Sequence, residues 1–147
     1  MNEIRTITEN LLKTLGVEAT YEERSFAEQP VLALTTSDGE LLIGSQGDRL
    51  RALNTLVRMI AEKKGLSERF TIDVNNYQHD AVLKLQETAK MLAERARSLK
   101  YDVELNPMRA FDRMIVHAAL SNEPHIKTES IGEGRERRIV IKYVEAN

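Results

Sequence analysis

The sequence predicts an α+β protein built from two small modules. Apolar residues recur every three to four positions in some segments and at every second position in others, so helices and strands alternate along the chain. Residues 1–75 are predicted to run helix, strand, strand, helix, helix, strand. Residues 76–147 are predicted to begin with a long helix and to continue as a small α/β domain with a three-stranded sheet.

The composition favours a soluble globular chain of the cytoplasm. The 147 residues are 41% hydrophobic and 30% charged, with a net charge of −2, which argues against a broadly basic coat for nucleic acid but leaves room for a local basic face. The chain has no cysteine, which excludes disulfides, thiolate metal sites and a cysteine nucleophile. Its apolar runs are too short to span a bilayer, so no membrane insertion is expected.

The first module is predicted from five periodic segments around a glycine loop. A helix over residues 4–15 ends at Gly16, two strands over 17–24 and 31–36 are expected to pair, and a third strand covers 70–74. A second long helix has an apolar face at Leu50, Leu53, Leu56, Val57 and Ile60.

The glycine loop is Gly44-Ser45-Gln46-Gly47, between a short helical turn at 40–43 and the second long helix. Glycine reaches backbone conformations closed to other residues and lets a ligand approach the main chain closely. The amides at the start of the next helix can then face a phosphate. Because many tight turns between helices contain two glycines, the meaning of this loop depends on its surroundings.

The second module is predicted to start with a helix capped by Asn75 or Asn76. Packing on a sheet is the simpler interpretation of this helix, and joining two modules is the alternative. Its apolar stripe is Val82, Leu85, Ala89, Leu92, Ala96 and Leu99.

A further helix is predicted to start at Asn106-Pro107, because asparagine is a good N-cap and proline suits the first helical position. Its spacing aligns Arg109, Arg113 and His117 along one side. The predicted buried face of this helix is Phe111, Met114, Ile115 and Ala118.

Arg113 and His117, with Arg109, form the strongest candidate site. Arginine matches phosphate through its forked donors, and histidine can donate to phosphate or stack on a base. The ordinary alternative is a helix of solvated arginines ending in a histidine. A terminal strand pair over 125–131 and 137–144 adds groups expected near the same helix: Lys127, Thr128, Ser130, Arg135, Arg137, Arg138 and Lys142.

Catalysis is not expected. The three histidines show no metal-ligand spacing, and the sequence contains neither a nucleophile elbow nor a phosphate-binding Walker or dinucleotide motif. No catalytic residue, metal site or cofactor is predicted.

With both halves described, the chain resembles the Jag (SpoIIIJ-associated) family of bacterial proteins, which join a KH domain to an R-x-x-x-H domain. The resemblance covers about 17–144. It rests on three motifs in the family's order: Leu41-Leu42-Ile43-Gly44-x-x-Gly47-x-x-Leu50, Phe111-Asp112-Arg113-x-Ile115-Val116-His117, and Thr128-x-Ser130-x-Gly132-Glu133-Gly134-x-x-Arg137-Arg138.

The resemblance implies a KH domain over 1–75, an R-x-x-x-H domain over 76–147, and binding of single-stranded RNA. Two departures stand out. Ser45-Gln46 is neutral where family loops usually carry a cation, and the extra N-terminal domain of longer members is expected to be absent. The implied nucleic-acid contacts are Gly44, Ser45, Gln46, Gly47, Arg49, Arg109, Arg113, His117, Lys127, Thr128, Ser130, Arg137 and Arg138.

The predicted function is therefore that of a cytoplasmic post-transcriptional regulator or RNA chaperone. The alternative is a protein-interaction adaptor in envelope or division regulation, with a KH loop that binds RNA weakly or not at all. Residues 1–75 favour the alternative, since 9 Lys/Arg against 12 Asp/Glu give a net charge of −3. A third interpretation is nucleotide binding at Arg113 and His117. Preference between RNA and single-stranded DNA, protein partners and oligomeric state stay open.

Overall fold

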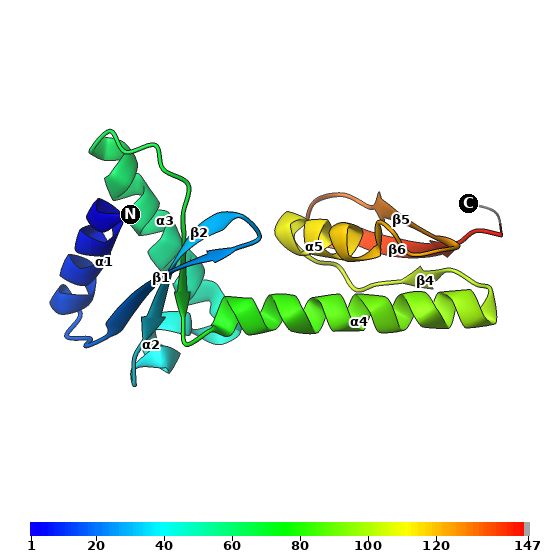
Figure 1. The fold of residues 1–147 in the computed structure, drawn as a ribbon, viewed down its shortest axis with the longest axis horizontal. Coiled ribbons are helices and arrows are strands. Elements are labelled where there is room, and N and C mark those ends of the chain that lie inside the picture. Colours follow the sequence, from blue (N-terminus) through cyan, green and yellow to red (C-terminus); the bar gives the residue numbers. More distant parts are fainter. Residues whose placement is uncertain (146–147) are drawn as a thin grey trace. The chain divides into compact units, whose positions relative to one another are not determined.

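The computed structural model describes residues 1–145, which divide into two compact units, Met1–Asp80 and Ala81–Asn147. No helix within residues 1–145 is long and apolar enough to cross a membrane. The same part of the chain holds no group of three or more side chains suited to bind a metal ion. Both units combine helices with a three-stranded sheet, which confirms the α+β prediction (Figure 1).

The first unit has the predicted order of helix, strand, strand, helix, helix, strand. Its elements are α1 (Asn2–Thr14), β1 (Thr20–Phe26), β2 (Gln29–Thr35), α2 (Gly39–Ile43), a 3-10 turn at Ser45–Gly47, α3 (Asp48–Lys63) and β3 (Thr71–Val74). The strands form a sheet in the order β1-β2-β3, with β1 antiparallel and β3 parallel to β2. The apolar faces of α1 and α3 share one core with the strand residues Leu32, Leu34, Ile72 and Val74.

Asn54 of α3 closes the free edge of β3. Its side-chain carbonyl accepts the Ile72 N–H at 2.8 Å, and its amide donates to the Ile72 carbonyl at 2.9 Å. A single side chain thus replaces a neighbouring strand for Ile72 and ties α3 to the sheet.

The longest helix, α4 (Tyr77–Leu99), begins one residue after the predicted cap position, but the predicted cap is wrong. Asn75 and Asn76 both have positive φ, and the buried carboxylate of Asp73 accepts the N–H groups of the first turn. Its oxygens lie 2.8 Å from the Gln78 nitrogen and 3.1 Å from the His79 nitrogen. An acidic group three positions further back therefore performs the capping.

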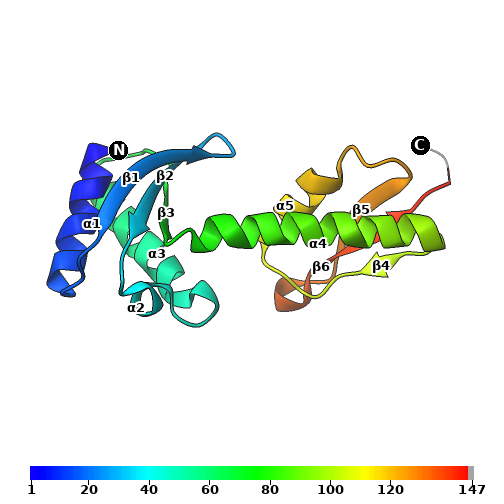
Figure 2. The ribbon, with the colours of Figure 1, turned by 60° about the horizontal axis from the view of Figure 1, so that its bottom comes forward.

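The second unit contains most of α4, β4 (Val103–Glu104), α5 (Ala110–Leu120), β5 (Ile126–Ile131), a 3-10 turn at Gly134–Glu136 and β6 (Arg138–Tyr143). The strands are antiparallel in the order β4-β6-β5. Figure 2 shows α4, β4, β5 and β6 from a second direction. The core combines alanines of α4 with branched residues of α5 and β6: Ala89, Ala93, Ala96, Val116, Leu120, Ile139 and Ile141.

The predicted helix start at Asn106-Pro107 is wrong. Residues 105–109 continue along β6, where the Leu105 N–H donates to the Ile139 carbonyl and the Met108 N–H donates to the Arg137 carbonyl. Pairing with the sheet outweighs the local preference for a helix, and α5 begins only at Ala110.

The predicted buried face of this helix is also mostly wrong. Phe111 and Met114 are 44% and 55% exposed, and Ala118 is exposed as well. Ile115 is buried as predicted, together with Val116 and Leu120. The helix therefore turns a different side towards the sheet than its amphipathic spacing indicated.

Candidate nucleic-acid interface

The glycine loop requires both of its glycines. Gly44 and Gly47 have φ values of +72° and +76°, and Gln46 between them also lies in the left-handed region. A Cβ atom on Gly47 would lie 2.8 Å from Cε1 of Tyr77, and one on Gly44 would collide with the Asp48 carboxylate. The tight turn thus presents main chain rather than side chains at the start of α3.

Two arginines hold this loop from α3. Arg51 Nη1 donates to the Gln46 carbonyl at 2.8 Å, and Arg49 Nη1 lies 3.3 Å from the Leu41 carbonyl oxygen. Arg49 was predicted from the motif. Arg51 was not, because only the turn of the chain brings its side chain back to the loop.

Asp48 reduces the attraction of the loop for anions. Its Oδ1 accepts the Arg49 N–H at 2.8 Å, so the carboxylate already occupies one of the amides at the helix start. Its negative charge stands where a phosphate would approach those amides. The exposed side chains of Ser45 and Gln46 add no positive charge to compensate.

A shallow hollow of about 750 Å³ lies beside the loop. Leu41 and Tyr77 are 49% and 38% exposed in its lining and offer an apolar side chain and an aromatic ring to a base. Tyr77 was not predicted as a site residue, because it lies thirty positions after Gly47 and meets the loop only in the folded unit.

The second candidate site lies at the border of α5 and β5. His117 Nδ1 and Thr128 Oγ1 share a hydrogen bond of 2.6 Å. Arg113, one turn earlier on α5, donates from Nη1 to the Met108 carbonyl at 2.6 Å. Both site side chains are half-buried and held in one direction, unlike freely solvated residues.

Arg137 and Ser130 complete this border. Arg137 Nη1 donates to the Gly132 carbonyl at 2.8 Å, while the Arg137 carbonyl accepts the Met108 N–H. Ser130 Oγ is buried and has no hydrogen-bond partner among residues 1–145. The fold thus brings together Arg113, His117, Thr128, Ser130 and Arg137.

Lys127 and Arg138 lie on the opposite face of this sheet. Thr128 pairs with Ile141, whose side chain faces the helices, so the neighbouring Lys127 points the other way. Arg138 donates to Glu104 at 3.0 Å and Glu136 at 3.2 Å. These two cations are separated from His117 by the thickness of the sheet.

The same open face holds a close ion pair between Lys142 and Glu129, at 2.8 Å. The hydrogen bond from Lys142 lowers the pKa of Glu129, and it raises the pKa of Lys142. Arg109, the last of the predicted contacts, is exposed at the N-cap of α5 rather than within the helix.

Comparisons with known proteins place this site in a known type of domain. Residues 83–143 match the family model of the R-x-x-x-H domain. The chain is 30% identical over 134 residues to RNA-binding protein KhpB of Clostridium symbiosum, covering 90% of this chain and 60% of that protein. It is 34% identical over 113 residues to RNA-binding protein KhpB of Bacillus subtilis, covering 75% of this chain and 54% of that protein.

A third relative, RNA-binding protein KhpB of Lactiplantibacillus plantarum, is 30% identical over 142 residues. That match covers 94% of this chain and 44% of the relative. The chain therefore spans about half the length of the curated relatives it matches.

Proposed function

Because this chain belongs to the Jag family, we propose that it binds single-stranded RNA through two modules and catalyses no reaction. A KH domain over residues 1–75 and an R-x-x-x-H domain over 76–147 would each contact the strand. The proposed role is that of a cytoplasmic post-transcriptional regulator or RNA chaperone. The names of the relatives support RNA as the ligand.

The observation that carries this proposal is the oriented pair Arg113 and His117. A bond from His117 Nδ1 to Thr128 leaves Nε2 of the ring available, and Arg113 keeps further N–H donors beyond the one bound to Met108. Phosphate oxygens accept such donors, and an imidazole can stack on an unpaired base. Thr128, Ser130 and Arg137 would complete the contact from the strand side.

The glycine loop has the weaker share of the binding in this proposal. Gly44, Ser45, Gln46 and Gly47 would contact the backbone, with Arg49 beside them and a base against Leu41 and Tyr77. Since Asp48 repels phosphate and the loop is neutral, we assign the loop to positioning the strand rather than to attracting it.

The test is the double variant Arg113→Ala with His117→Ala, measured against a fluorescent single-stranded RNA at fixed salt. We expect a loss of affinity of about tenfold or more, because one hydrogen bond to a charged group contributes about 1.5 kcal/mol. Arg95→Ala, which removes an exposed arginine from α4, is the matched control. Unchanged affinity in the double variant would remove the second module from the proposal. Competition with single-stranded DNA of the same sequence measures the preference for the 2′-hydroxyl.

The second candidate function is a protein-interaction adaptor in envelope or division regulation. The Asp48 carboxylate at the loop and the neutral Ser45-Gln46 pair favour it. Crosslinking in cells followed by sequencing of the bound RNA separates the two functions. An adaptor recovers no more RNA than a strain carrying the Arg113→Ala, His117→Ala variant, whereas an RNA-binding protein recovers a distinct set.

A further inference from the structure

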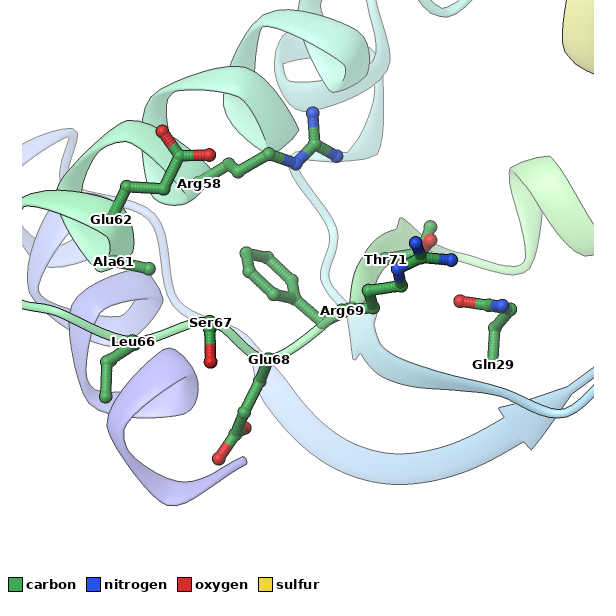
Figure 3. A pocket seen from close by; sticks show the side chains of 10 residues that line it. Gln29, Arg58, Ala61, Glu62, Leu66, Ser67, Glu68, Arg69 and Thr71 are labelled. Carbon is green, nitrogen blue, oxygen red and sulfur yellow. The ribbon is translucent and has the colours of Figure 1, made fainter.

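A second pocket lies at the other end of α3 from the glycine loop (Figure 3). It has a volume of about 350 Å³ and forms between β2, the C-terminal half of α3 and the segment leading into β3. None of the motifs singled out in the sequence falls in it. The lining residues that carry the argument are Gln29, Arg58, Ala61, Ser67, Arg69 and Phe70.

The pocket holds two uncommitted cations. Within residues 1–145, the side chains of Arg58 and Arg69 make neither an ion pair nor a hydrogen bond. Figure 3 shows their guanidinium groups on one side of the pocket and the carboxylates of Glu62 and Glu68 on the other. The charges are thus separated, and the arginine side can receive an anion.

The floor of the pocket is apolar. Phe70 and Ala61 are 6% and 2% exposed, and Leu66 packs beside them. Gln29 and Ser67 at the rim can donate and accept hydrogen bonds. A flat apolar floor with a polar rim and adjacent guanidinium groups matches a nucleotide, whose base needs the first and whose phosphate needs the second.

We infer that this pocket is a further nucleotide subsite for the RNA strand that the glycine loop contacts. The inference rests on the proposed function. Arg58 follows Gly47 by eleven residues, so the subsite lies about 16 Å along α3 from the loop. A strand long enough to follow α3 would place one phosphate between Arg58 and Arg69 and its base over Phe70.

The test compares Arg58→Ala with Arg69→Ala, as a double variant, with the control Lys63→Ala and Lys64→Ala. Both remove two exposed cations from the same end of α3, but the lysines do not line the pocket. Each protein is titrated with random-sequence RNA of about six nucleotides, enough for the roughly four that a KH loop clamps, and with RNA of about sixteen. Circular dichroism checks folding.

We expect the arginine variant to bind the longer RNA about tenfold more weakly, with its salt slope reduced by about 0.7 for one lost phosphate contact. Its affinity for the short RNA should match the unaltered protein, and the lysine control should change by no more than about twofold. Equal losses in both variants would overturn the subsite, as would an equal loss for both RNA lengths. If the unaltered protein binds neither RNA, the proposed function itself fails.

Discussion

His117 Nδ1 and Thr128 Oγ1 lie 2.6 Å apart, so a strand hydroxyl sets the orientation of the histidine on α5. When the hydroxyl donates to Nδ1, the proton of the neutral ring sits on Nε2, which then donates outward. The hydroxyl thereby acts on the ligand through the ring.

Thr128→Val should weaken the binding of single-stranded RNA by about fivefold, since it removes the hydroxyl and keeps the shape of the side chain. The measurement is RNA affinity together with a pH titration of the His117 ring by NMR, in which the tautomer signal should change. Ser121→Ala, an exposed hydroxyl on the same unit, is the control. Unaltered affinity with an altered ring signal would show that the orientation of His117 does not matter for RNA.

Ser45→Lys should strengthen RNA binding and steepen its salt dependence by about 0.7 in slope, since one more phosphate is neutralised on a single strand. Ser45→Asp should do the reverse. Ser45 is exposed, so both changes leave the fold intact, unlike any substitution at Gly47, which would press on Tyr77. Thr6→Lys on α1 controls for total charge. If all three variants bind alike, the loop does not contact RNA.

Asp48→Asn should raise RNA affinity by about threefold to fivefold, because a unit charge about 4 Å from a phosphate costs about 1 kcal/mol even in water. Asparagine keeps the acceptor for the Arg49 N–H and removes only the charge. Glu3→Gln, an exposed carboxylate on α1, is the comparison. An increase of the same size in both variants would mean that Asp48 acts only through net charge.

Asp73→Asn should destabilise the first unit by about 1–3 kcal/mol, because a buried carboxylate that accepts several backbone N–H groups is replaced by a neutral amide. Urea unfolding followed by circular dichroism measures the change. Asp80→Asn, also at the start of α4 but exposed, should cost less than about 1 kcal/mol. Similar losses in the two variants would contradict a capping role for Asp73.

Much of the architecture follows from local patterns. Periods of two and of three to four, with glycines at their ends, predicted the order of elements in both units. The spacing of Gly44 and Gly47 and of Arg113 and His117 identified the family, since these distances along the chain survive without any knowledge of packing.

Pairing between distant segments decided what those patterns could not. The start of α5 moved to Ala110 because residues 105–109 bond to β6, and α4 is capped from Asp73 in β3. Which apolar side of α5 is buried depends on the sheet beneath it, so Phe111 and Met114 are exposed despite their spacing.

The sequence by itself determined the two modules, the glycine loop and the chemical groups available for binding. Only the tertiary structure decided which groups meet. Strand register sends Thr128 and Ser130 to His117 and sends Lys127 and Arg138 to the far face, because neighbouring residues of a strand point in opposite directions. Folding likewise brought Tyr77 to the loop and Arg58 and Arg69 to one pocket, across separations that no local pattern records.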